Sequence, residues 1–200
     1  MKHTFPCNTS AHGLVETWFG DAFSQLHPLL QQLHRLGGTL SGPVEVRTGS
    51  GLAGWFGRRL ARSLGIPESC ERCAFEVQVG SNGKQMFWRR TFAGDARMLS
   101  VFEPVGAWPN GYWIEQTGAV QLRLAVEIID GGWYWRLRQA RLRGVPLPRH
   151  LLPTTAAWKR IENGRYRFQV EFSLPWLGTI LAYGGLLDAE RLGEPHDVDE

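Results

Sequence analysis

The segment VQLRLAVEIIDGGWYWRLRQ, Val120–Gln139, carries the pattern that decides the fold. Apolar and polar residues alternate on both sides of a short Gly-rich turn, which is typical of two antiparallel strands joined by a tight hairpin. We place the two-residue loop at Gly131 and Gly132. That loop sets four pairs: Asp130 with Trp133, Ile128 with Trp135, Val126 with Leu137, and Glu127 with Arg136. The segment therefore predicts a hairpin with one buried and one solvent-exposed face.

The same period of two recurs along most of the chain. AFEVQVG (74–80) and RYRFQVEFSLP (165–175) alternate in the same way. Turn signals follow one another closely, at Gly80, Ala93, Pro109, Asp130 and Asn163. Connections this short do not carry parallel crossovers, and a flat sheet of so many strands leaves long, aggregation-prone edges. The sequence predicts a mostly β (α+β) protein, a strongly curved antiparallel meander or calycin-like barrel of about 8–10 strands.

Two amphipathic helices precede these strands. SQLHPLLQQLHRLGG (24–38) has a leucine stripe that ends at Gly37, and LAGWFGRRLARSLGIP (52–67) separates an apolar face from a basic one. The apolar face of the second helix comprises Leu52, Trp55, Phe56, Leu60 and Leu64, and the basic face Arg58, Arg59 and Arg62. We expect both helices to pack against the sheet or plug it. A basic amphipathic helix can also lie on a membrane, but at this length we expect packing on the sheet and no membrane contact.

Length and composition indicate one domain. We expect a partly ordered segment at 1–25 and an acidic, flexible tail at 188–200; the bounds of the domain between them, 26–187, are those implied by the family resemblance given below. No apolar run approaches the roughly 20 residues that span a bilayer, and the first residues lack the apolar core of a signal peptide. The sequence therefore predicts a cytoplasmic protein with reduced cysteines.

Charge and cysteine spacing exclude several functions. The net charge is +3, and the arginines are spread along the chain rather than gathered in a stripe, so we expect no nucleic-acid partner. Cys70 and Cys73 form a C-x-x-C that leads into a strand. The remaining cysteine is Cys7, and no histidine lies near the pair. We therefore predict structural thiols, with neither a metal site nor a redox pair.

The segment RTGSGLAG (47–54) contains the spacing G-x-G-x-x-G of dinucleotide-binding loops. Its surroundings do not fit, because no crossover helix, parallel second strand or ribose-binding acid follows. We interpret these glycines as a corner between strand and helix, and we expect no cofactor. A helix N-terminus beside Arg47 can hold an anion, which makes Arg47, Gly49 and Gly51 a candidate anion site.

The candidate ligand site lies on the inward face of the strand QMFWRRTF (85–92). There Arg90 shares a face with Trp88, and a buried guanidinium is costly without a partner. The partner is either a carboxylate or phosphate head group of a ligand, or an internal acid such as Glu115, unless the side chain reaches out at the barrel rim. Further candidates to contact the ligand are Trp133, Trp135 and His34. The tryptophans could equally fill the core, and His34 could be a packed or capping residue.

A series of short motifs resembles one bacterial family. The motifs are LHRLGG (33–38), LSGPVEVRTGSG (40–51), SLGIP (63–67), WRRTFAG (88–94), LRGVPLPRHLLP (142–153), GRYRFQVEFSLPWLG (164–178) and LAYGGLL (181–187). Over residues 26–187 the chain resembles the family catalogued as domain of unknown function 4166. The resemblance implies no activity, because the family's function is not established. Some members look fused to a separate dehydrogenase-like Rossmann domain, which implies that this module is not the nucleotide binder.

No motif identifies a reaction, so we predict no catalytic residue. Our leading hypothesis is a non-catalytic module that binds a hydrophobic or acyl-type small molecule. The alternatives are a structural or interaction domain with a filled core that serves a partner enzyme, and an enzyme of unknown chemistry. A cavity above about 300 Å³ reached by Trp135 and Arg90 favours the first hypothesis, and a filled interior excludes it.

Overall fold

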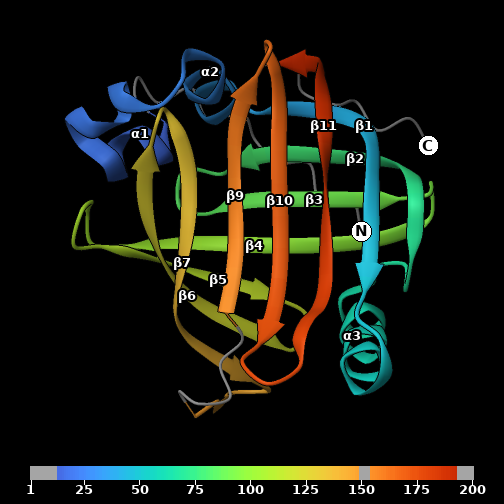
Figure 1. The fold of residues 1–200 in the computed structure, drawn as a ribbon. Coiled ribbons are helices and arrows are strands. Elements are labelled where there is room, and N and C mark those ends of the chain that lie inside the picture. Colours follow the sequence, from blue (N-terminus) through green and yellow to red (C-terminus); the bar gives the residue numbers. More distant parts are fainter. Residues whose placement is uncertain (1–12, 149–153, 193–200) are drawn as a thin grey trace, which may run out of the picture.

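The computed structural model describes residues 13–148 and 154–192, and the strands of these residues form a closed antiparallel barrel (Figure 1). Ten strands close the ring in the order β6-β5-β4-β3-β2-β1-β11-β10-β9-β7, with β7 paired back to β6, and the two-residue strand β8 extends from β7. The strand bounds are β1 Gly38–Thr48, β2 Cys70–Ser81, β3 Met86–Phe92, β4 Ala96–Val105, β5 Tyr112–Thr117, β6 Val120–Ile129, β7 Gly132–Leu142, β8 Val145–Pro146, β9 Thr154–Glu162, β10 Arg165–Leu174 and β11 Gly178–Leu192. The mostly β prediction and its barrel form are confirmed.

The β6–β7 hairpin forms as predicted, but its loop is one residue earlier. Ile129 pairs with Gly132, so the loop is Asp130 and Gly131. Both loop residues have positive φ, 49° and 74°, as the tightest hairpin turns require, and Asp-Gly is a preferred pair there. The predicted pairs were therefore wrong. The observed partners of Ile128 and Val126 are Trp133 and Trp135, respectively.

This error leaves the buried face unchanged, because the register moves by two residues and side chains alternate with that period. The predicted ion pair also forms, although Glu127 lies opposite Tyr134. Arg136 Nε reaches diagonally across the hairpin and donates to Glu127 Oε2 at 2.8 Å. Diagonal contacts of this kind are within the reach of long side chains.

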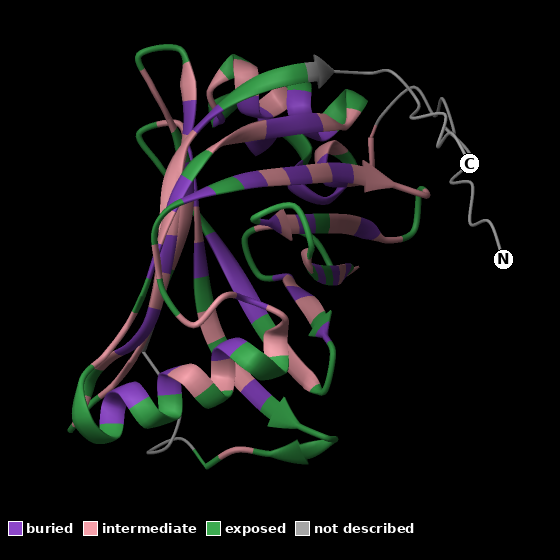
Figure 2. Cartoon of the chain, turned by 90° about the vertical axis from the view of Figure 1, so that its right-hand side faces the viewer, coloured by how far each residue is buried: buried purple, intermediate pink, exposed green. Residues whose placement is uncertain are grey.

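Helices lie at the two ends of the barrel (Figures 1 and 2). At one end are α1 (Leu14–Phe19), the 3-10 helix η1 (Gly20–Gln25) and α2 (Pro28–Leu36); at the other is α3 (Gly51–Leu64). Within the segment 1–25, predicted as partly ordered, α1 and η1 bury Val15, Trp18, Phe19 and Phe23 in the core. Residues 1–12 lie outside the described residues. The predicted plug at one barrel end therefore includes two helical segments ahead of α2.

Helix α3 packs through small residues rather than through its large apolar face. It buries Ala53, Gly54, Gly57 and Ala61. A Cβ atom on Gly57 would lie 1.8 Å from the carbonyl oxygen of Ile180 on β11, so only glycine allows this approach. The predicted orientation was wrong for three residues of the apolar face, Leu52, Trp55 and Phe56, which are exposed. Leu60 and Leu64 do pack against the core.

Strand β11 continues to Leu192, through the start of the segment predicted as a flexible tail. Asp188 is part of this strand and accepts a hydrogen bond from Arg165 Nε at 2.6 Å. The first residues of the predicted tail 188–200 are therefore paired in the barrel. Residues 193–200 lie outside the described residues.

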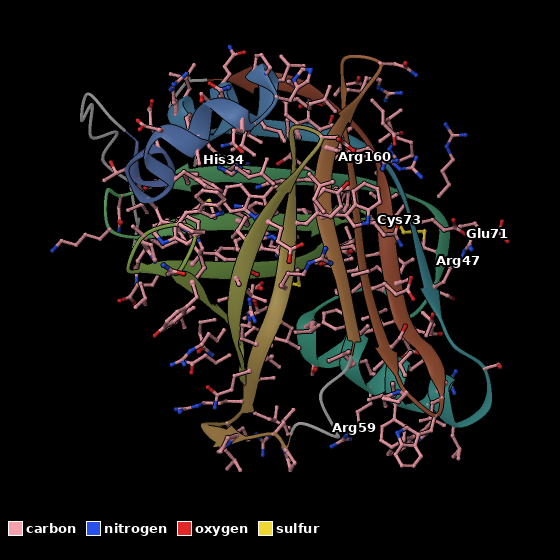
Figure 3. The ribbon with its side chains drawn as sticks, turned by 60° about the vertical axis from the view of Figure 1, so that its left-hand side comes forward. His34, Arg47, Arg59, Glu71, Cys73 and Arg160 are labelled. Atoms are coloured by element: carbon pink, nitrogen blue, oxygen red, sulfur yellow. A yellow bond between two sulfur atoms is a disulfide. The ribbon has the colours of Figure 1, made fainter. Side chains whose placement is uncertain are left out.

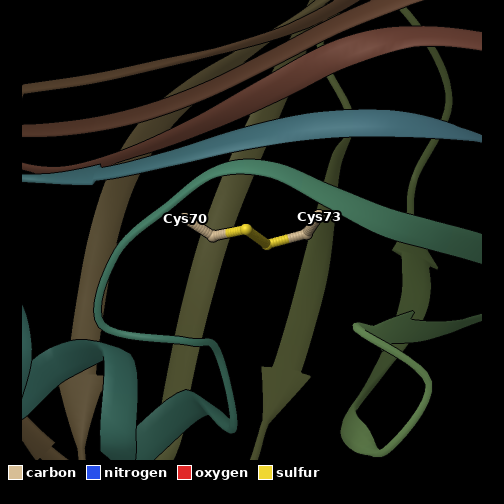
Figure 4. Close-up of a disulfide and its surroundings, with 2 residues drawn as sticks. All are labelled: Cys70 and Cys73. Atoms are coloured by element: carbon tan, nitrogen blue, oxygen red, sulfur yellow. A yellow bond between two sulfur atoms is a disulfide. The ribbon is translucent and has the colours of Figure 1, made fainter.

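Cys70 and Cys73 are joined by a disulfide (Figure 4). The prediction of reduced thiols was therefore wrong, whereas their place at the start of a strand was predicted correctly. The register of β1 against β2 shifts here, because Val44 pairs with Cys73 and Val46 with Cys70. This bulge on β2 leaves the two cysteine Cα atoms 5.8 Å apart, within the range that a disulfide bridges.

Candidate functional site

The barrel encloses a cavity of about 250 Å³. Its walls are mostly aliphatic and aromatic side chains, and it extends from Leu33 on α2 to Leu60 and Leu64 on α3. Both Arg90 and Trp135 line it, as the binding hypothesis requires. The volume is below the value of about 300 Å³ that favours the binding hypothesis. The interior is nevertheless hollow, whereas the structural alternative predicts a filled one.

Arg90 is buried on β3 and belongs to a chain of polar side chains on three neighbouring strands. Its Nη1 donates to Ser100 Oγ on β4 at 2.8 Å, and Ser100 Oγ lies 2.6 Å from Thr117 Oγ1 on β5. Thr117 in turn donates to Glu115 Oε1 at 3.1 Å. Within the described residues, Glu115 is thus linked to Arg90 through two hydroxyl groups and not by a direct ion pair.

The three predicted tryptophans lie close together on the inward side. The ring centroids of Trp133 and Trp135 are 4.9 Å apart, and both Trp135 and Trp88 contact Phe102, with centroids 5.6 Å and 5.5 Å away. Trp88 and Trp135 line the cavity. Trp133 is fully buried behind them, edge-on to Phe19 of α1. Two of the three tryptophans therefore form cavity wall, and the third joins the wall to the helical plug.

The structure brings a residue to this site that was not predicted from the sequence. Lys159 on β9 is buried, and its Nζ lies 2.6 Å from Nε2 of His34 on α2. The same Nζ lies 4.1 Å and 4.4 Å from the ring centroids of Trp133 and Trp88. The signal was the alternation of Ala157, Lys159 and Ile161, since a strand that turns its neighbouring apolar residues inward also turns the lysine inward. Figure 3 shows His34 beneath α2 at this end of the barrel.

The buried lysine and histidine both favour their uncharged forms. Burial, together with the nearby positive charge of Arg90, lowers the pKa of Lys159 well below its ordinary value. Burial and the proximity of Lys159 likewise lower the pKa of His34. In the described part of the chain, no carboxylate lies within ion-pair distance of Lys159 Nζ. His34 Nδ1 and Trp133 Nε1 are buried and have no hydrogen-bond partner among these residues.

The predicted anion site has two of its groups engaged elsewhere. Arg47 is exposed and pairs with Glu45, with its Nη2 2.6 Å from Glu45 Oε2, and Figure 3 shows it far from His34. The Gly49 N–H donates to the Ile180 carbonyl oxygen at 3.1 Å, and Gly51 begins α3 with a φ of 53°. The corner between strand and helix is as predicted, and all strand pairings in the described residues are antiparallel, unlike those of a dinucleotide-binding unit.

The described residues contain no group of three or more histidine, cysteine or acidic side chains that could hold a metal ion. None of their helices has both the length and the apolar character needed to cross a bilayer.

Fold and interior together define a closed antiparallel β-barrel with a hollow, largely apolar interior and buried basic side chains in its wall. The chain belongs to the family described as Domain of unknown function (DUF4166), whose profile matches residues 26–187. These bounds are those over which the sequence was predicted to resemble the family. None of the curated proteins matches the chain.

Proposed function

We propose that this domain binds a hydrophobic or acyl-type small molecule inside the barrel, with the polar head of the ligand toward Arg90 and Lys159. The observation that carries the proposal is the placement of two buried basic side chains in the wall of a largely apolar cavity. A filled interior, which the structural alternative requires, does not agree with a cavity of about 250 Å³.

The basic side chains supply hydrogen-bond donors for the head group. A guanidinium has five N–H donors in a fixed fork, and the described residues use one of them for Ser100. A carboxylate or carbonyl oxygen beside Arg90 would accept from the others. It would also offset the cost of burying the positive charge, which an apolar environment makes large.

The opposite end of the cavity suits an apolar tail. Leu60 and Leu64 on α3 line it there, and Phe172 lies further along β10 than Phe168, the cross-strand partner of Lys159. Each CH₂ group that leaves water for such a surface contributes about 0.8 kcal/mol. The ligand would thus be held by its tail and oriented by its head. A cytoplasmic location, a partner enzyme, and the lack of nucleic-acid and membrane partners stay predictions.

Calorimetric titration with decanoate and decan-1-ol tests the proposal. We expect both to bind, because both have an apolar tail. Arg90→Met should weaken decanoate at least about tenfold, equivalent to 1.4 kcal/mol, and leave decan-1-ol nearly unchanged. Arg89→Met is the matched control, since Arg89 is exposed on the same strand.

A second pair of variants tests the location. Leu122→Trp adds bulk to the cavity wall and should weaken both ligands at least about tenfold. Leu99→Trp makes the same change at an exposed position on β4 and should have no effect. If neither ligand binds, or if all variants bind them equally, the cavity is not the binding site.

A further inference from the structure

The side-chain amine of Lys159 lies where a molecule in the cavity can reach it. Lys159 is one of the residues that line the cavity, and its Nζ is held between the rings of Trp88 and Trp133 and the imidazole of His34. The sequence has three lysines, Lys2, Lys84 and Lys159. Of the two in described positions, Lys84 is exposed and Lys159 is buried. Among the described residues, a single lysine thus stands in the interior wall.

The surroundings of this amine favour its neutral, nucleophilic form. An amine attacks a carbonyl carbon only in its neutral form, and enzymes obtain that form near neutral pH by desolvation or by a neighbouring positive charge. Both are present here, because Lys159 is buried and Arg90 lies against the same Trp88 ring, 5.0 Å from its centroid. A base is also in contact, since His34 Nε2 is 2.6 Å from Nζ.

We propose that Lys159 forms a reversible imine with an apolar aldehyde bound in the barrel cavity. This inference rests on the proposed function, because the cavity must first hold the apolar part of the ligand. It goes further by naming the reactive group of that ligand and the residue that bonds to it.

The step balances without an oxidant or a reductant. The lone pair of Nζ attacks the aldehyde carbon, a C–N bond forms, and the C=O π electrons move to oxygen. His34 Nε2 accepts a proton from nitrogen and returns it to oxygen, which gives the carbinolamine. A second transfer from nitrogen to oxygen lets the oxygen leave as water while the nitrogen lone pair forms the C=N bond. One amine and one aldehyde thus give one imine and one water, and hydrolysis reverses the step.

Other carbonyl groups suit the site less well. A carboxylate does not condense with an amine unless it is first activated. An ester or thioester would lose its alcohol or thiol and leave a stable amide, which would block the cavity permanently. The aldehyde alone among these gives an adduct that water can reverse, as a binding module requires.

Reductive trapping of the full chain tests the proposal. The protein is incubated with decanal and cyanoborohydride at neutral pH, and the modified residues are found by intact-mass and peptide analysis. We expect one decyl group on Lys159, formed about tenfold or more faster than on Lys84. Excess decan-1-ol should suppress the adduct on Lys159 and not that on Lys84, a readout that needs no variant.

Two variants complete the test. Lys159→Met should abolish the fast adduct, whereas Lys84→Met should leave both the fast adduct and decan-1-ol binding unchanged. Binding of decan-1-ol without any preferential trapping at Lys159 overturns the aldehyde proposal and leaves the proposed function intact. Failure of decan-1-ol and decanoate to bind overturns both. Equal trapping at Lys84 and Lys159 shows that the buried amine has no special reactivity, and also overturns the inference.

Discussion

Lys159 makes the stability of the barrel depend on pH. Its pKa in the folded protein lies below the ordinary value of 10.5, because of burial and then of Arg90. Below pH 10.5 the unfolded chain therefore binds more protons at this residue than the folded chain does. By proton linkage, the free energy of unfolding must rise with pH between the folded-state pKa of Lys159 and 10.5. The slope from one such group is at most about 1.4 kcal/mol per pH unit.

We expect Lys159→Met to remove this dependence. The stability of Lys159→Met relative to the unmodified protein should fall steadily as the pH rises from the folded-state pKa of Lys159 to about pH 9.5, as the cost of burying the lysine disappears. Urea unfolding at several pH values measures it. Other titrating groups around the site fall outside this window. His34 has a pKa lowered from 6.5 by burial and by Lys159, and Tyr183 has one raised from 10.0 by burial.

Lys84→Met is the control, because Lys84 is exposed in the turn between β2 and β3. Its stability should run parallel to that of the unmodified protein across the same pH range. Parallel curves for Lys159→Met as well would show that Lys159 carries its charge in the folded state.

At the scale of elements, the alternating strands could be predicted from sequence because one face of each is buried. The β6–β7 hairpin shows the limit of that signal, since alternation fixes the face of Trp133 and Trp135 but leaves registers two residues apart equivalent. Turn chemistry at Asp130 decides between them. The same alternation also predicts the correct face for Arg90.

The segment of α1 and η1 carries a helical pattern in addition to the two helices predicted. Its buried apolar residues recur at helical spacing: Val15, Trp18, Phe19, Ala22, Phe23 and Leu26. Helix α3 differs from its prediction for another reason. Its large apolar face predicted burial, but which face contacts the barrel is decided by how close the helix backbone comes to β11, and that distance is a tertiary property. The pairing of Lys159 with His34 likewise depends on the contact between α2 and β9, which neither segment specifies alone.

Gly57 tests this close approach. Gly57→Ala should destabilise the protein by about 2–3 kcal/mol, because the added Cβ would meet the Ile180 carbonyl oxygen at 1.8 Å. Helix propensity alone predicts the opposite sign, a gain of about 1 kcal/mol. Gly80→Ala is the control, since a Cβ there meets nothing within 4 Å. Thermal or urea unfolding measures the change in stability of both variants. A neutral or stabilising Gly57→Ala would mean that α3 does not rest against β11.

At the scale of the whole molecule, the barrel depends on its helical plug, and part of that plug lies outside the family match at 26–187. Trp18 on α1 packs edge-on against Phe19 and Trp113, with centroids 4.9 Å and 5.3 Å away, and its carbonyl oxygen accepts a hydrogen bond from the Trp108 N–H. Helix α2 is also part of the plug, and it positions His34 against Lys159. Loss of the plug should therefore weaken both the fold and the site.

Trp18→Ala tests this dependence, and Trp176→Ala is the matched control. The Trp18 side chain is 3% exposed, whereas that of Trp176 is 82% exposed. Truncation of a buried tryptophan costs about 3–5 kcal/mol, whereas a surface change stays within about 0.5 kcal/mol. We expect Trp18→Ala to lower the unfolding free energy by the larger amount and to weaken decan-1-ol binding, because loosening the plug displaces α2, whose Leu33 lines the cavity. Urea unfolding and calorimetry on the same samples measure both. Equal stability of the two variants would show that α1 is dispensable for folding. The N-terminal boundary of the domain would then coincide with the start of the family match at residue 26.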